Sequence, residues 1–281
     1  MVRERANEVI RALNGGRPGG TLAYMTENTD GLSPLHRRVA AEAAGTFVLV
    51  LGVIGTAVFG AGFDEGKGGL NVGFLGVALA LGLSVFVGAS VFGPVSGGHF
   101  NPAVTIGLAV ARRFAWREVP AYVVAQVVGG ALASSLLVAI AGSLSDVGAA
   151  STGWGGLSPG GHGLPAAFLI ETVTTCLLVA VVLGVTTFPT SNPPLVIGLT
   201  LTLVALVAIP VSNGSFNPAR SIATAVYGGP EALGQLWMSV VAPVLGAVIA
   251  GAVYVVLGAR VRKTATVAAP APLGHRAAPT D

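Results

Sequence analysis

The feature that most constrains this chain is a series of six long apolar segments. Most contain the ~20 residues that cross a ~30 Å hydrocarbon core as an α-helix. A segment surrounded by lipid must satisfy its own backbone hydrogen bonds, and a helix does so within itself. The sequence therefore predicts an all-α membrane protein with six transmembrane helices. The expected spans are roughly 38–62, 70–93, 117–141, 164–187, 194–212 and 234–258.

The composition also indicates that most of the protein surface faces the lipid bilayer. Only 10% of the residues are charged and 53% are hydrophobic, whereas an average soluble domain has about 25% charged residues. The single cysteine, Cys176, excludes an intrachain disulfide framework and a cysteine-based zinc site. We expect it to pack within a span. Because no phosphate loop, hydrolase motif or metal-ligand cluster is evident, we expect no enzyme activity, no cofactor, no metal site and no nucleic-acid partner.

The basic residues predict the orientation. If the N-terminus is inside, every Lys and Arg except Lys67 and Arg220 falls on the cytoplasmic side of six spans. The clusters at 112–117 and 260–263 lie close to span ends, where the positive-inside rule applies. The segment 142–163 contains no Lys or Arg and falls outside. We therefore expect a multi-pass protein of the plasma (inner) membrane with both termini cytoplasmic.

The terminal segments differ from the apolar part of the chain. Residues 1–35 are polar, and the end of the chain is rich in Ala and Pro. We expect 1–35 and 259–281 to be disordered cytoplasmic tails, because such segments bury little apolar surface. The segment 142–163 is expected to be an extracellular connecting loop.

An internal repeat divides the chain. PVSGGHFNPA at 94–103 returns as PVSNGSFNPA at 210–219 with two differences. VVAQVVGGALA at 123–133 likewise matches VVAPVLGAVIA at 240–250. Each half holds three spans and one short apolar segment, and three is odd. The second half must therefore insert upside down, as an inverted-topology repeat. We take 36–141 as the first repeat and 164–258 as the second.

The two short apolar segments, 101–111 and 217–226, each follow an Asn-Pro-Ala. They are too short to cross the membrane. In an inverted repeat they enter from opposite faces, so we expect two re-entrant half-membrane helices that meet at the midplane. Non-helical backbone is tolerated at that depth only when it is buried in protein or lines a water-filled cavity. The arrangement predicts a pore.

Asn-Pro is a helix start. Asn is a good N-cap, and Pro fits the first helical position because no N–H is needed there. Asn101-Pro102 and Asn217-Pro218 therefore place two helix N-termini, each with about half a positive charge, at the membrane centre. The Asn amides can donate hydrogen bonds to a water in the lumen and orient it. This arrangement repels cations and interrupts a proton-conducting chain of waters.

The strings GPVSGGHFNPAVT and PVSNGSFNPARS resemble the two signature loops of the aquaporin (major intrinsic protein) family. The resemblance extends over about 36–258 and includes AEAAGTF near the start. It implies a right-handed helical bundle with one pore per subunit, usually in a homotetramer. By matching position, the pore motifs are Asn101, Pro102 and Ala103 in the first loop and Asn217, Pro218 and Ala219 in the second.

The resemblance also implies a second constriction, at Leu81, Ala205, Gly214 and Arg220. Water-specific members place Phe at the first position and His at the second, and glycerol facilitators place Trp at the first. We therefore expect a wider, more apolar filter than a strict water filter. Ser221 is typical of water channels. FAWREVPAYVVAQVVGG resembles the nodulin-like branch and its bacterial relatives, some of which pass metalloid hydroxides.

Other polar residues allow two interpretations. Glu42 and Glu171 lie within spans, where ionisable residues are usually functional. The family pattern implies that they support the pore loops; proton coupling is the alternative. The His99 ring faces the cytoplasmic vestibule, as a lining or gating group, or packs within its loop. Gln126 and Pro243, which correspond in the repeat, are interpreted as packing or kink positions.

These features together predict a passive channel for water and other small uncharged solutes that excludes protons and ions. A strict water channel and a facilitator of metalloid hydroxides, glycerol or urea remain open. An ion-coupled secondary transporter also uses inverted repeats and broken helices, but the spans contain few charges. A structural membrane-junction protein is the remaining alternative.

Overall fold

The computed structural model describes residues 33–61, 71–188 and 190–267, with side chains described as far as 258. Within this part of the chain all regular structure is helical. The elements are α2 (Leu35–Phe59), α3 (Gly73–Ser96), α4 (Pro102–Val110), η3 (Trp116–Glu118), α5 (Val119–Ala141), α6 (Leu144–Gly148), η4 (Gly155–Leu157), α7 (Leu164–Thr187), α8 (Pro193–Ser212), α9 (Pro218–Ala225) and α10 (Gly229–Val267).

Six of these helices are long and apolar enough to cross a membrane: α2, α3, α5, α7, α8 and α10. Their outer faces are apolar as well. Leu83, Leu132, Leu169 and Leu199, on four different helices, are each more than half exposed. Such a surface is stable in lipid but not in water. The expected all-α membrane protein with six spans is confirmed.

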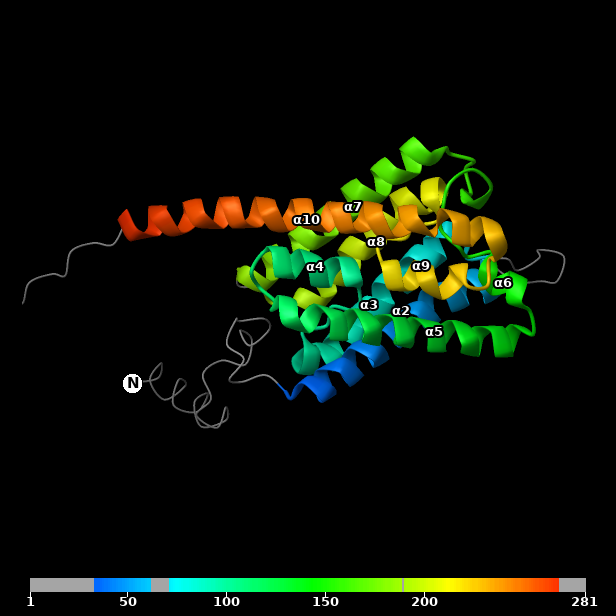
Figure 1. The fold of residues 1–281 in the computed structure, drawn as a ribbon, viewed down its shortest axis with the longest axis horizontal. Helices are drawn as coiled ribbons and strands as arrows, with labels where there is room; N and C mark the ends of the chain where they lie inside the picture. Colours follow the sequence, from blue (N-terminus) through cyan, green and yellow to red (C-terminus); the bar gives the residue numbers. More distant parts are fainter. Residues whose placement is uncertain (1–32, 62–70, 189, 268–281) are drawn as a thin grey trace, which may run out of the picture.

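The helices pack as two interlocked halves. In the first half α2 packs against α3 and α5, and in the second α7 packs in the same way against α8 and α10. The half-helices cross between halves, because α4 packs against α10 while α9 packs against α5. Figure 1 shows α4 and α9 within the bundle, one toward each end. This exchange matches the inverted repeat expected from the sequence.

Two boundaries differ from expectation. The last helix continues to Val267, so a tail beginning at 259 is wrong for the backbone up to that residue. Figure 1 shows these final turns projecting from one end of the bundle. The expected loop 142–163 contains the short helices α6 and η4. Residues 1–32 and 268–281, which make up most of the expected disordered tails, lie outside the described residues, as does Lys67.

The two halves approach closely where α3 crosses α8. Gly82 lies opposite Gly198, and a Cβ added to Gly198 would lie 2.6 Å from the Gly82 carbonyl oxygen. No real Cβ approaches a backbone atom so closely, and backbone cannot yield as a flexible side chain can. Small residues at this crossing therefore set the distance between the halves, as is common in membrane helix packing.

We predict that Gly198→Ala lowers stability by about 1–3 kcal/mol, the usual cost of overpacking. The thermal unfolding midpoint of the purified protein in detergent measures it. Gly184→Ala is the matched control, because a Cβ at Gly184, also within a spanning helix, meets nothing within 4 Å. Equal midpoints for the two variants would contradict the close crossing.

Candidate functional site

The two repeated strings, 94–103 and 210–219, fold into the same turn. Each follows a helix that contains a proline near its end, Pro94 in α3 and Pro210 in α8. Three corresponding positions in each loop have positive φ: Gly97 (95°) and Asn213 (64°), Gly98 (68°) and Gly214 (61°), and Phe100 (50°) and Phe216 (52°). A left-handed backbone is uncommon for a bulky residue such as Phe. Its presence in both copies shows that the surroundings determine this conformation.

Each loop ends in a capped helix start. The Asn101 Oδ1 accepts a hydrogen bond from the Ala103 N–H at 2.9 Å. The Asn217 Oδ1 accepts from the Ala219 N–H at 3.0 Å. Proline occupies the first turn of both α4 and α9. The expected Asn cap and Pro start are confirmed, and two helix N-termini approach each other inside the protein.

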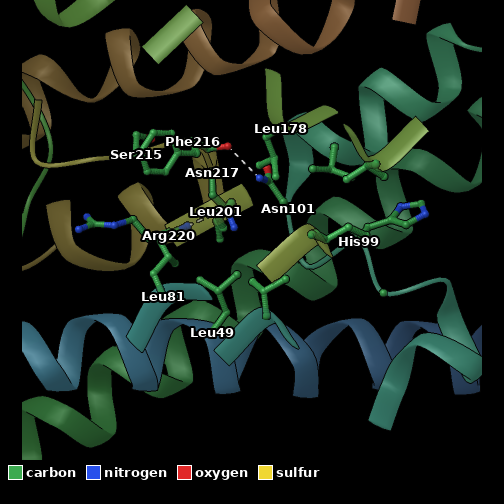
Figure 2. A pocket seen from close by; sticks show the side chains of 15 residues that line it. Leu49, Leu81, His99, Asn101, Leu178, Leu201, Ser215, Phe216, Asn217 and Arg220 are labelled. Carbon is green, nitrogen blue, oxygen red and sulfur yellow. Dashed lines mark hydrogen bonds between the residues drawn. The ribbon is translucent and has the colours of Figure 1, made fainter. Parts of the chain in front are cut away.

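Hydrogen bonds between the loops hold these helix ends together. The Asn101 Nδ2 donates to the Phe216 carbonyl oxygen at 2.8 Å, and the Asn217 Nδ2 donates to the Phe100 carbonyl oxygen at 2.8 Å. Figure 2 shows the first of these bonds, from the Asn101 side chain to the backbone carbonyl oxygen of Phe216. An amide nitrogen has two hydrogens. Each asparagine therefore keeps one N–H for a molecule beside it.

A cavity runs past the asparagines. Asn101, Asn217 and Arg220 contribute polar groups to its wall, and Leu49, Leu178 and Leu201 contribute apolar ones. The space in it that a water molecule can enter is about 30 Å³. One water needs roughly 10–15 Å³ by this measure. The cavity thus has room for a short single file of waters beside a few fixed hydrogen-bond donors.

Glu42 supports the first loop. Its side chain, fully buried on α2, accepts hydrogen bonds from the His99 N–H at 3.0 Å and the Phe100 N–H at 2.7 Å. The Ser96 hydroxyl and the Gln126 amide each donate to it at 2.7 Å. These donors compensate a buried carboxylate that would otherwise be very unfavourable. They also hold the loop backbone in its turn.

Glu171 on α7 supports the second loop in the same way. It is fully buried and accepts from the Ser215 N–H at 2.7 Å and the Phe216 N–H at 2.8 Å. The Ser212 hydroxyl donates to it at 2.6 Å. Neither Glu171 nor Glu42 lines the cavity. The geometry matches the expected support role for both carboxylates and leaves them without contact to a permeating molecule.

Arg220 borders the cavity in a fixed position. Its Nη1 donates to the Ala150 carbonyl oxygen at 2.8 Å and its Nη2 to the Asn213 carbonyl oxygen at 3.3 Å. The residue is buried. Figure 2 shows Arg220 beside Leu81, another lining residue. A guanidinium held in this way presents a permanent positive charge and N–H donors to the lumen.

The other two expected filter residues contribute less to the wall. Ala205, fully buried on α8, and Gly214, in the second loop, do not line this cavity. Leu201 on α8, one turn before Ala205, lines it. The structure therefore brings Leu81 and Arg220 together with the paired asparagines, whereas the small residues at the remaining positions supply no side chain to this space.

The His99 ring packs in an aromatic cluster. It is buried between Phe114 and Tyr122, with ring centroids 4.9 and 5.1 Å away. Its Nδ1 lies 3.1 Å from the Thr105 hydroxyl. Figure 2 shows the ring directed away from the asparagines. His99 also belongs to the residues that line the cavity, so its packing against aromatic neighbours and its place in the wall agree with both interpretations of this residue.

Gln126 has a role that the sequence interpretation missed. It was expected to be a packing or kink position, but its amide nitrogen donates to Glu42 and to the Thr105 hydroxyl, at 2.7 and 3.0 Å. Ser96 and Ser212 were also missed. Their signal was available, because both lie in the repeated PVS string and occupy the same place in it. Within the described residues no group of His, Cys, Asp or Glu is arranged to hold a metal ion.

Comparison with known proteins adds sequence relatives. The family model described as major intrinsic protein matches residues 32–254. The chain is 45% identical over 225 residues to a protein named Aquaporin Z from Photorhabdus laumondii subsp. laumondii. That match covers 78% of this chain and 96% of the relative.

Solved structures share the fold. The aquaglyceroporin from Plasmodium falciparum superimposes with a TM-score of 0.70 at 22% identity, over 82% of this chain and all of that one. A structure described as an FNT family ion channel matches with a TM-score of 0.52 at 16% identity, over 82% of this chain and 91% of that one. Identities this low show a common fold alone.

We predict that Glu42→Gln and Glu171→Gln each destabilise the protein, by about 1–3 kcal/mol, because the new amide turns N–H groups toward loop N–H donors. Thermal unfolding in detergent measures the effect, and water flux in vesicles should fall with it. Glu231→Gln is the control, because Glu231 is exposed at the start of α10. Unfolding midpoints equal to that of the control would contradict the support role.

Proposed function

The chain belongs to the major intrinsic protein family, and from this membership we propose that it is a passive channel for water and other small uncharged solutes. The observation that carries the proposal is the pair of capped helix N-termini joined by reciprocal Asn hydrogen bonds beside a narrow cavity. The printed names of the relatives, an aquaporin and an aquaglyceroporin, agree with it.

The same geometry supports exclusion of ions. The two helix ends each bring about half a positive charge to the cavity, and Arg220 adds a fixed full charge beside it. A cation meets repulsion at both places. A water that accepts from the spare N–H groups of Asn101 and Asn217 points its own hydrogens away, so a proton cannot pass along the file.

The range of solutes follows from the filter positions. Ala205 and Gly214 add no bulk or polar group to the cavity, and Leu81 adds an apolar wall. We propose that water is the main permeant and that small neutral solutes such as glycerol, urea or boric acid also pass. A strict water channel is the second candidate, because the space in the cavity is about 30 Å³.

The geometry also weighs against ion-coupled transport. A coupled transporter needs an ionisable group that the permeating species contacts. Glu42 and Glu171 are fully buried, saturated by loop donors and absent from the cavity wall. We propose that their charge serves the structure alone, and that no enzymatic step is involved.

Orientation and assembly complete the proposal. Arg37, Arg112 and Arg117 lie at the end where α2 and α5 begin, whereas Asp146 and Glu231 lie at the other end. The positive-inside rule places the first end in the cytoplasm. We propose a plasma (inner) membrane protein with both termini cytoplasmic, assembled as a homotetramer as the family resemblance implies.

Flux measurements on liposomes test the channel. Stopped-flow light scattering after a sucrose step is expected to show water permeability well above that of empty vesicles. Gradients of glycerol, urea and boric acid measure solute entry, and an internal pH dye is expected to show no proton flux. Permeability equal to that of empty vesicles for every solute would refute the proposal. Water flux without any solute entry would favour the strict water channel.

We predict that the double variant Leu81→Phe with Ala205→His reduces the entry of glycerol, urea and boric acid by about tenfold or more while it retains water flux. The larger side chains narrow the filter, and the imidazole adds a donor for water. Initial rates of solute entry into liposomes measure the change. Leu83→Phe with Leu203→Phe is the control, because both leucines are exposed on the outer faces of the same two helices. Unchanged solute entry in the test variant would show that these positions do not form the filter.

A further inference from the structure

One ion pair fixes the basic end of the bundle. Arg38, buried near the start of α2, forms a two-pronged contact with Glu118 in η3, with N···O distances of 2.7 and 2.9 Å. The Arg38 Nε also donates to the Ser33 carbonyl oxygen at 3.0 Å. Two parallel bonds between a guanidinium and a carboxylate leave little rotational freedom. The beginnings of α2 and α5 are therefore held side by side.

Each partner of this ion pair has an exposed arginine as its neighbour in the chain. Arg37 and Arg117 both point to the surface. Within the described residues neither is in an ion pair, and Glu118, the acidic residue beside them, is already bonded to Arg38. The ion pair thus brings the chain positions of two exposed arginines to the same end of the bundle, where Glu118, already bonded to Arg38, is the acidic group that also interacts with Arg117.

Exposed apolar residues lie at the same end of the bundle, next to these arginines in the chain or two residues from them. Trp116 is 57% exposed and Leu35 is 41% exposed. These two residues begin the spanning segments Trp116–Ala141 and Leu35–Phe59, so they mark the boundary where the apolar surface starts. Figure 1 shows the starts of α2 and α5 at the same end of the bundle. Tryptophan at such a boundary has its ring among headgroups and upper acyl chains.

We propose that Arg37, Arg117, Trp116 and Leu35 form a site for the headgroup of an anionic phospholipid of the inner leaflet. The two guanidinium groups neutralise and hydrogen-bond the phosphate. The indole and Leu35 contact the glycerol backbone and the first methylenes of the chains. A soluble phosphate gains nothing from these apolar contacts, and an acidic protein does not reach the level at which the spans begin.

The site is independent of the pore. None of its four residues lines the cavity. The proposal rests on insertion in a membrane and on the cytoplasmic placement of this end, but not on what the channel conducts. Lipid binding and water flux are therefore separate measurements, and the failure of one is distinguishable from the failure of the other.

Native mass spectrometry of the full-length protein tests the site. The protein in detergent is titrated with phosphatidylglycerol or with phosphatidylcholine of the same chains, and bound lipids are counted. The wild type is expected to bind more phosphatidylglycerol than phosphatidylcholine. Each arginine near an anionic surface contributes on the order of fivefold in affinity, so Arg37→Gln with Arg117→Gln should weaken phosphatidylglycerol binding by roughly tenfold or more.

Two controls make the result decisive. Arg112→Gln removes an exposed arginine from the same end but from outside the site, and Arg37→Gln alone is its single-charge match. If Arg37→Gln loses more phosphatidylglycerol binding than Arg112→Gln does, a local site is supported. An equal loss in the two variants indicates only a general charge effect and overturns the proposal. Equal binding of the two lipids by the wild type, or displacement of the lipid by inorganic phosphate, also overturns it. Water flux of the variants in liposomes verifies that they are folded.

Discussion

The reciprocal hydrogen bonds between the pore loops are the contacts on which the rest of the structure depends. Each asparagine caps its own half-helix with its oxygen and reaches the opposite loop with its nitrogen. Half a helix cannot span a bilayer, and its free end is costly in lipid. Because each end is satisfied by the other, neither re-entrant segment is stable at this depth alone. The left-handed backbones of Phe100 and Phe216 turn their carbonyls toward the opposite asparagine, and the interlocked packing of α4 and α9 follows.

The buried carboxylates show how one architecture tolerates two different surroundings. Glu42 and Glu171 make equivalent bonds to loop N–H groups and to a serine. Beyond these bonds the halves diverge. In the first half Gln126 and the Thr105 hydroxyl continue the network. In the second half a chain of hydroxyl groups takes the place of this network. The Thr152 hydroxyl donates to the Ser221 hydroxyl at 2.8 Å, and the Ser215 hydroxyl lies 2.7 Å from the same oxygen. The repeat conserves the support of the loop backbone, and the second layer of contacts differs because each half packs different neighbours.

The connecting segment between the repeats takes part in the pore. The Ala150 carbonyl holds Arg220, and the Ser151 carbonyl accepts from the Asn213 amide at 2.9 Å. The Gly153 N–H donates to the Ser212 carbonyl at 3.0 Å. This segment therefore orients the filter arginine. Residues 149–153 contain no charged group, so the Ala150 carbonyl holds the guanidinium here without a carboxylate that would cancel its charge.

The sequence alone determined three features. The length of the apolar segments predicted the six spans, and the odd number of spans in each repeat predicted the inversion. The Asn-Pro pairs predicted the starts of the two half-helices, because an N-cap depends only on residues close together in the chain. The roles of the asparagine oxygens and of both glutamates followed from the same repeat, with the family resemblance. Only the tertiary structure decided where polar side chains with several possible partners point. The His99 ring packs between aromatic residues, Gln126 bonds to a carboxylate, and the asparagine nitrogens bond across the loops, because these choices depend on neighbours far apart in the chain. The basic surface beside the Arg38–Glu118 ion pair was likewise invisible in sequence, since residues 38 and 118 meet only when the bundle forms.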